Sequence, residues 1–238
     1  MVSIKLPHEI KSEETKKKLL DATEQMLSQY DFKHLTVRNI CAESGVAYGS
    51  FYHHFSSKEN LLYIFTRQLF QEAYAQNPVP SWIAPDDYIK SCLWYIIVYG
   101  RFCESLGRDL TKYLYTNCPQ DMFAEVYQQE ILPRLERADA AGYIDSERNH
   151  DFRDEAHISL LSKDLAITYK GVLLWWSNSF EEDEEPLHAT LEHLSFNMLF
   201  SYSSPMYQNS DFPRLLLTES PQFKDSIKID NIFSRKAK

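Results

Sequence analysis

The sequence contains few of the residues that mark fibrous, disordered or disulfide-linked proteins. Its 238 residues include only 6 glycines, 10 prolines and 4 cysteines, which excludes collagen-like and low-complexity chains. The cysteines lie far apart without a Cys-x-x-Cys pair, and no basic start followed by an apolar stretch indicates a signal peptide. We therefore expect reduced thiols in a cytoplasmic protein. The longest apolar run, 92–99, has 8 residues, whereas a membrane-spanning helix needs roughly 20.

A surplus of positive charge is also missing. The net charge is -9, although neutralising the phosphates of a nucleic acid requires lysine and arginine. The charge is unevenly distributed, because residues 1–76 carry nine basic and nine acidic side chains, while residues 77–238 carry all of the acidic excess. We therefore expect two parts of the chain with different partners.

Helical periodicity is what the sequence has in abundance. Apolar residues recur at steps of three and four, and no segment favours a β-strand, so the expected fold class is all-α. In the N-terminal part the pattern predicts helices over 13–30, 37–44 and 48–54, and a longer one that ends near residue 77. Further helices are expected over 86–103, 107–116, 120–141, 154–180 and 186–203.

Capping residues predict where the first helices begin and end. Ser12 is the expected N-cap of the first helix and Thr36 that of the second, which Gly45 then ends. Ser56 and Glu59 have the spacing of a capping box that opens the fourth helix.

Pro78, Pro80 and Pro85 indicate the boundary between the two parts, because proline disrupts helix interiors. We expect one helical domain over 1–76, including a connecting helix, and a second helical domain over 77–203. The tail, 204–238, is expected to be ordered at most in part, with its apolar residues able to pack on the body: Phe212, Leu215, Leu216 and Leu217.

Residues 36–55, TVRNICAESGVAYGSFYHHF, have the layout of a helix-turn-helix. Two helices that cross steeply need a small side chain at the contact, a glycine in the turn and an apolar residue behind it. Cys41, Gly45 and Val46 fill these roles.

At this point the sequence resembles the TetR family of transcriptional regulators, over about fifty residues. The residues that carry the resemblance are Leu19, Leu20, Ala22, Phe32, Thr36, Val37, Arg38, Ile40, Gly45, Val46, Gly49, Ser50, Phe51, Tyr52, His54, Phe55, Lys58, Glu59, Leu61 and Leu62. The resemblance implies a recognition helix in the DNA major groove, dimerisation through the last two long helices, and a small molecule in the C-terminal core that alters DNA affinity. A ligand-responsive regulator, more often a repressor than an activator, is the function that follows.

The resemblance also implies which residues contact DNA. Tyr48, Gly49 and Ser50 open the recognition helix and would reach base edges, while other positions contact phosphates. Ala47 departs from the family, which has serine or threonine there as a cap. The expected DNA-contacting set is Thr36, Arg38, Ala47, Tyr48, Gly49, Ser50, Tyr52, His53, His54 and Lys58. The alternatives are that Tyr48 only completes a turn and that His54 is a half-buried ring supporting Phe55.

The C-terminal part is rich in aromatic residues, which predicts a pocket for a flat or apolar ligand. The candidate lining residues are Trp94, Tyr95, Tyr99, Phe102, Tyr127, Trp175 and Asn178. The alternative is that these rings simply pack a helical core.

The last two long helices are the expected dimer interface, which would set two recognition helices roughly 34 to 36 Å apart on a pseudo-palindromic operator. The candidate residues are Leu161, Leu165, Leu173, Leu191, Leu194 and Met198. The alternative is that they pack inside one subunit.

Two other functions compete with DNA binding. A protein that keeps the fold but binds a partner protein is favoured by Ala47 and by the neutral N-terminal part. An enzyme is disfavoured, because no nucleophile elbow, phosphate loop or His/Cys metal set is present. We expect no metal, no cofactor and no membrane partner.

Overall fold

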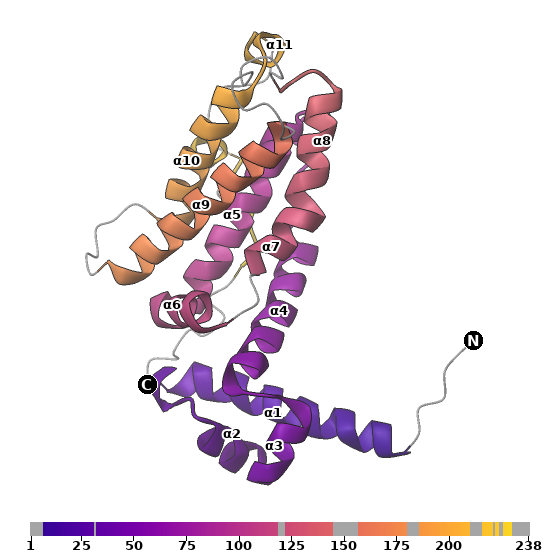
Figure 1. Cartoon of the computed structure of the whole chain (residues 1–238), viewed down its shortest axis with the longest axis vertical. Coiled ribbons are helices and arrows are strands. Elements are labelled where there is room, and N and C mark those ends of the chain that lie inside the picture. The colour runs from indigo at the N-terminus through magenta and orange to yellow at the C-terminus, as the bar shows by residue number, and fades with distance from the viewer. Residues whose placement is uncertain are drawn as a thin grey trace.

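The computed structural model describes residues 7–30, 32–118, 122–144, 157–179, 186–209, 216–220, 222–223 and 226–229. Three helices form a small head at one end: α1 (Pro7–Gln29), α2 (Val37–Ser44) and α3 (Tyr48–His54) (Figure 1). α4 (Lys58–Gln76) leads from the head into an elongated helical body. The described residues form no strand beyond an isolated bridge between Ile144 and Ser203, so the predicted all-α class is confirmed.

Short-range signals build the head. The Thr36 hydroxyl accepts a hydrogen bond from the Asn39 amide at 3.2 Å and caps α2, and Gly45 ends this helix at a φ of 66°, which favours glycine. α2 and α3 have the predicted bounds. Their buried faces meet α1, so that Leu19, Ile40 and Phe51 are 0% exposed.

Two predicted caps are wrong. α1 already includes Pro7, so Ser12 lies inside the helix. α4 is capped by Ser57, whose hydroxyl accepts from the Asn60 amide at 3.1 Å, and not by Ser56. Adjacent serines offer the same chemistry, and the backbone path of the preceding turn selects one of them.

α5 (Tyr88–Leu106) is the central helix of the body and is buried on nearly all sides, as its apolar sequence predicted. It packs against α4, against α8 (Leu132–Ala140) and above all against α10 (Leu187–Tyr202). A Cβ atom on Gly100 would lie 2.7 Å from the Cα of His188. The absence of a side chain at Gly100 therefore allows α5 and α10 to approach closely.

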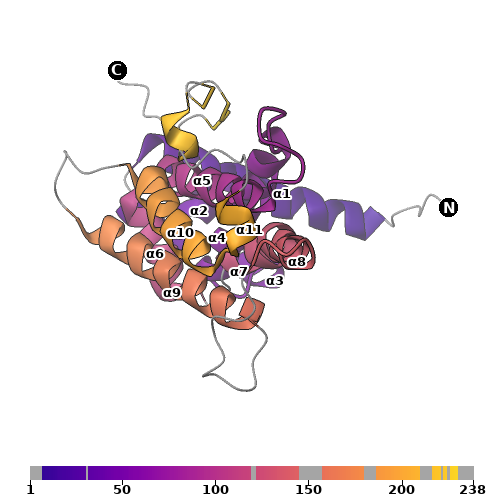
Figure 2. The same ribbon diagram turned by 90° about the horizontal axis from the view of Figure 1, so that it is seen from above.

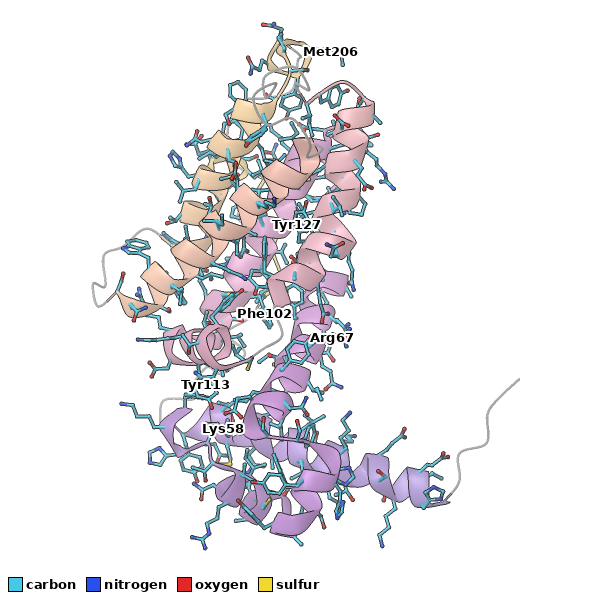
Figure 3. The ribbon with its side chains drawn as sticks, viewed as in Figure 1. Lys58, Arg67, Phe102, Tyr113, Tyr127 and Met206 are labelled. Carbon is cyan, nitrogen blue, oxygen red and sulfur yellow. The ribbon has the colours of Figure 1, made fainter. Side chains whose placement is uncertain are left out.

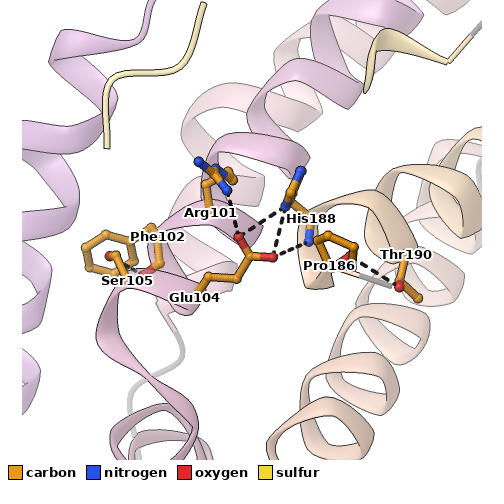
Figure 4. Close-up of polar contacts among 7 residues, drawn as sticks. All are labelled: Arg101, Phe102, Glu104, Ser105, Pro186, His188 and Thr190. Carbon is orange, nitrogen blue, oxygen red and sulfur yellow. Dashed lines mark hydrogen bonds and ion pairs between the residues drawn. The ribbon is translucent and has the colours of Figure 1, made fainter. Parts of the chain in front are cut away.

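A polar contact fixes the same pair of helices (Figure 4). The Glu104 carboxylate of α5 accepts from the His188 amide at 3.1 Å and lies 2.9 Å from His188 Nδ1, while Arg101 Nη1 approaches at 3.4 Å. Burial alone would raise the pKa of Glu104, but the hydrogen bonds and charge of His188 hold it below its ordinary value of 4.5.

The predicted helix over 120–141 is three elements instead of one: α7 (Met122–Val126), the π-turn η2 (Tyr127–Ile131) and α8. Pro133 explains the interruption, because proline has no N–H and its ring clashes with the carbonyl four residues earlier. A π-turn is one way for a helix to absorb such a defect.

The remaining body helices are α6 (Arg108–Asn117), α9 (His157–Asn178) and α11 (Pro205–Gln208). Residues 154–156 and 180 of the predicted 154–180 helix lie outside the described residues. α9 lies at the outer edge of the body, and the C-terminal segment lies on the other side of α5 (Figure 2). In that segment Leu217, within η3 (Leu217–Glu219), is 2% exposed, as predicted for a residue packed on the body. Phe212 and Leu215 lie outside the described residues.

Candidate nucleic-acid interface

α3 lies at the outer end of the head, and its two faces differ (Figure 1). Phe51 points into the core, whereas Tyr48 and Tyr52 are 55% and 48% exposed. The two tyrosine hydroxyls are 3.0 Å apart and their rings pack edge to face. The hydrogen bond with Tyr48, more than burial, raises the pKa of Tyr52, so the Tyr52 hydroxyl stays protonated near neutral pH. The result is an exposed unit of two rings and two hydroxyl groups.

Most other predicted DNA-contacting residues also lie in the head around this pair. Thr36, Arg38, Ala47, Gly49 and His53 are exposed. Ser50 and His54 are half-buried. The half-buried position of His54 agrees with a DNA contact and equally with the alternative, a ring that packs beside Phe55. Ala47 makes no side-chain hydrogen bond to cap α3.

Lys58 is placed differently from the rest. Its ammonium group lies 4.3 Å from the centre of the Tyr113 ring and 5.1 Å from that of Phe32, and it is 3.4 Å from the Leu35 carbonyl oxygen. Burial lowers the pKa of Lys58. The side chain therefore lies at the junction of head and body, next to Tyr113 of α6 (Figure 3), and not among the exposed residues of α2 and α3.

The same junction contains contacts that the sequence did not predict. The Tyr113 hydroxyl donates to the Glu59 carboxylate, and this hydrogen bond is the main cause of the lowered pKa of Glu59. The Cys118 thiol donates to the Glu59 backbone carbonyl at 3.6 Å. Burial raises the pKa of the Cys118 thiol to about 11, so this thiol stays protonated near neutral pH. Glu59 and Tyr113 are 54 residues apart in the chain, so no helical periodicity could reveal their contact.

α4 is also tied to the body further along its length. Arg67 Nε donates to the Glu125 carboxylate of α7 at 2.7 Å, and the Tyr63 hydroxyl donates to the same carboxylate. Although burial opposes it, these hydrogen bonds lower the pKa of Glu125, while burial and Glu125 together raise the pKa of Tyr63 to about 12.

A cavity of about 270 Å³ lies beside Glu125, between α4, α5, α7 and η2. Its lining residues are Phe70, Gln71, Tyr74, Ala75, Tyr95, Glu125, Val126, Gln129 and Glu130. Of the seven predicted pocket residues, Tyr95 alone lines this cavity. The Arg134 guanidinium covers one face of the Tyr95 ring, with Cζ 4.3 Å from the ring centre. Arg134 Nη1 also forms an ion pair with the Glu130 carboxylate at 3.0 Å.

The other predicted pocket residues do not line this cavity. Trp94, Tyr99 and Phe102 are 0% exposed and pack within the core, and Tyr127 is 8% exposed and does not line the cavity. Trp175 is 51% exposed and Asn178 is exposed, both on the outside of α9. A single sequence marks aromatic residues but cannot tell those that fill a core from those that line a space within it.

The predicted dimer residues divide in the same way. Leu161, Leu165, Leu173 and Leu191 are at most 1% exposed, because α9 and α10 pack on the body through them. They are therefore core residues of this subunit, as the alternative of packing inside one subunit predicts. Leu194 is 38% exposed and Met198 is half-buried, so these two remain candidates for the interface.

Two further features bear on the function. In the described part of the chain, no three His, Cys, Asp or Glu side chains lie together as metal ligands would. A search of the same residues finds no helix with the length and hydrophobicity needed to cross a membrane.

A helix-turn-helix at the tip of a long helical body is an arrangement typical of proteins that bind DNA through a helical head. Residues 19–63 match the family model described as bacterial regulatory proteins, tetR family. The TetR-family resemblance is thereby confirmed over the head and the start of α4. This part of the chain is a TetR-type DNA-binding domain.

The chain also shares its fold with solved regulatory proteins. The fatty acid degradation regulator FadR from Bacillus halodurans has 16% sequence identity and a TM-score of 0.51, covering 83% of this chain and 97% of its own. MexZ, a repressor responsible for antibiotic resistance in Pseudomonas aeruginosa, has 18% identity and a TM-score of 0.50, covering 82% of this chain and 98% of its own. At such identities the likeness concerns the fold. No curated protein matches the sequence.

Proposed function

We propose that the protein is a ligand-responsive transcriptional repressor that binds a pseudo-palindromic operator as a homodimer in the cytoplasm. The observation that carries the proposal is the exposed Tyr48 and Tyr52 pair on the recognition helix of a TetR-type head. Large aromatic side chains are normally buried, so two of them on the outer face of one short helix indicate a binding surface.

The tyrosine pair has groups suited to reading bases. One hydroxyl proton is used between the two residues, which leaves one proton to donate and oxygen lone pairs to accept, and the ring edges can contact a thymine methyl group. A Cβ atom added to Gly49 would have no neighbouring atom within 4 Å, so this position faces open space. Because Gly49 has no side chain, the backbone of α3 can approach DNA closely there. We assign phosphate contacts, which orient the head without reading sequence, to the exposed residues Arg38, Thr36 and His53.

The test is selection of bound duplexes from a random DNA pool by the purified protein, by Tyr48→Ala and by Tyr30→Ala. Tyr30 is the matched control, because it is 50% exposed but follows α1 instead of lying on α3. We expect the wild type and Tyr30→Ala to enrich one inverted repeat that Tyr48→Ala does not enrich. Equal enrichment by all three proteins would contradict a base-reading role for Tyr48, and no enrichment by any of them would favour a protein that binds a partner protein in place of DNA.

A second copy of the chain is the proposed occupant of the exposed face of α9 and α10. Ile167, Leu174, Trp175 and Leu194 are 70%, 38%, 51% and 38% exposed, and the first three recur along one side of α9. We expect Ile167→Glu to convert a dimer to a monomer in sedimentation velocity. Ile10→Glu is the control, since Ile10 is 47% exposed on α1 in the head.

The cavity beside Glu125 is the proposed ligand site. Phe70, Tyr74 and Tyr95 supply apolar surface for a small aromatic ligand. Glu125 holds Tyr63 and Arg67 of α4, so a ligand that changes this contact would shift α4 and the head toward one arrangement. The neutral probe N-phenyl-1-naphthylamine is expected to bind the wild type, and Ala75→Trp, which fills the cavity, is expected to abolish binding. Probe binding that survives Ala75→Trp would place the ligand elsewhere.

A further inference from the structure

The C-terminal segment crosses the body on the side of α5 opposite α9 (Figure 2). Its described residues, 216–220, 222–223 and 226–229, are called the strap here. The strap contacts five residues that come from three separate parts of the chain: Asn77, Trp82, Trp94, His188 and Glu192. These five residues are called the docking surface.

The N-terminal end of the strap is held by a buried carboxylate. Glu192 of α10 is 0% exposed and accepts hydrogen bonds from the amide of Leu217, from the amide of Thr218 at 3.1 Å and from the Thr218 hydroxyl at 2.5 Å. A buried carboxylate is costly unless it is hydrogen-bonded. In the described part of the chain, the hydrogen-bond donors to Glu192 come from the strap, so its burial depends on the strap.

The other end is held by a side-chain amide. Asn77, 1% exposed, accepts from the Lys228 amide at 2.6 Å and donates to the Lys228 carbonyl at 3.2 Å. This two-point contact copies the way in which neighbouring β-strands pair. Two further hydrogen bonds hold Asn77 in position for this contact. Its side-chain amide also donates to the Ala73 carbonyl at 2.6 Å, and its backbone carbonyl accepts from Trp94 Nε1 at 3.0 Å.

Side chains are recognised between the two ends. The Phe223 ring packs edge to face on Trp94, with centroids 6.3 Å apart, and stacks parallel to His188 at 6.1 Å. Trp82 Nε1 donates to the Ser226 hydroxyl at 3.2 Å. The docking surface therefore binds the strap as it would bind a peptide. Glu192 and Asn77 bind its backbone at two points, here called the two clamps, and other contacts are made to a threonine, to an aromatic ring five residues later and to a hydroxyl group three residues beyond the ring.

Most apolar side chains of the strap are only partly buried against the core. Leu217 is the one described strap residue with a fully buried apolar side chain, while Phe223, Ile227 and Ile229 are partly buried. Segments with few buried apolar contacts open at a much lower free energy than the core.

From these contacts we infer that Asn77, Trp82, Trp94, His188 and Glu192 form a peptide-binding surface, and that the strap is its reversibly bound ligand from the same chain. This inference concerns a surface remote from the recognition helix and does not rest on DNA binding. Because Asn77 follows α4 and Glu192 lies in the N-terminal half of α10, occupancy of the surface links the C-terminal end of α4 to α10.

Hydrogen exchange followed by mass spectrometry on the full chain tests whether the strap opens separately. We expect residues 216–229 to exchange at least about 100-fold faster than α5, as a local opening would. Glu192→Ala is expected to speed exchange at Lys228 as well as at Thr218, because the two clamps hold one segment. Asn197→Ala is the control, since Asn197 is exposed on α10 and contacts His193 instead of the strap. Exchange of the strap together with α5 would overturn the inference.

A second experiment leaves the docking surface intact and so does not depend on whether Glu192→Ala folds. The strap is weakened in the full chain by Thr218→Ala with Phe223→Ala, and a fluorescent peptide of residues 216–229 is added. We expect this variant to bind the peptide at least about tenfold more tightly than the wild type, in which the attached strap competes at high effective concentration. Absence of saturable binding to the variant would overturn the inference, as would equal binding to both proteins. Dimers of the wild type that exchange straps would contradict occupancy from the same chain.

Discussion

In the head, the hydrogen bonds that start and stop helices join residues close in sequence, such as Thr36 with Asn39 and Val46 with Cys41. In the body, the polar contacts that hold helices together join residues far apart, such as Glu104 with His188 and Asn77 with Lys228, which are 84 and 151 residues apart. The head can therefore be recognised in a single sequence, whereas the body is defined by contacts that no local pattern contains. Four substitutions probe this difference, in order of decreasing expected effect.

Phe51→Ala should have the largest effect, because Phe51 is 0% exposed and packs on Phe55 in the small head core. We expect the free energy of unfolding of the head to fall by about 3–5 kcal/mol. Tyr52→Ala is the control, since the neighbouring ring is 48% exposed, and should cost less than about 1 kcal/mol. Urea denaturation followed by circular dichroism measures both, and equal losses would mean that the head has no core of its own.

Gly100→Ala should destabilise the body, because the added Cβ would lie 2.7 Å from the His188 backbone and force α5 and α10 apart. The expected cost is about 1–3 kcal/mol. The same substitution at Gly49, in α3, meets no atom within 4 Å and should be neutral or stabilise by up to about 1 kcal/mol. Thermal unfolding of the two variants checks the opposite signs, and destabilisation by both would remove the contrast.

Glu104→Gln tests the charge in the contact between α5 and α10. At pH 7 we expect a loss of about 1.5 kcal/mol, because charge-assisted hydrogen bonds to His188 are weakened. The folded pKa of Glu104 is lowered, so its contribution is present above about pH 4.5 and is lost as the pH falls through the folded pKa. The two proteins should therefore converge in stability as the pH falls through the folded pKa of Glu104, measured by urea denaturation. Glu136→Gln, at an exposed position of α8, should change little at either pH, and a constant difference for Glu104→Gln would show that its charge is not the cause.

Thr36→Ala should have the smallest effect, a loss of about 1 kcal/mol, because it removes the side-chain cap of α2. Ala47→Ser should return a similar amount, since α3 has no side-chain cap. Thermal unfolding of the single and double variants measures both, and we expect the two changes to be nearly additive. A loss of several kcal/mol for Thr36→Ala would mean that this residue does more than cap the helix.

The residues of the helix-turn-helix show why the head could be predicted. A cap, a glycine at positive φ and an apolar period of three to four residues are all local, so the bounds of α2 and α3 and the burial of Phe51 followed from the sequence. The cavity could not be predicted in this way. Its lining combines Phe70 and Tyr74 of α4 with Glu125 of α7 and Glu130 of η2, and the relation between these helices depends on packing.

Lys58 and the leucines of α9 illustrate the same limit from the opposite side. The family pattern predicts a phosphate contact for Lys58, but the aromatic rings of Phe32 and Tyr113 hold its ammonium group at the junction. The periodicity of α9 identified an apolar face correctly, yet that face packs on its own subunit, and the exposed apolar residues Ile167 and Trp175 lie on another side.

The sequence by itself determined the all-α class, the helix-turn-helix and the separation of a neutral head from an acidic body, because these depend on composition and on residues within one or two helical turns. The tertiary structure alone decided which aromatic residues line a cavity, how Lys58 and Tyr113 join head to body, and where the C-terminal strap lies. These features depend on contacts between different elements, such as Glu59 with Tyr113 and Asn77 with Lys228, which are 54 and 151 positions apart, and such contacts exist only after the helices have packed.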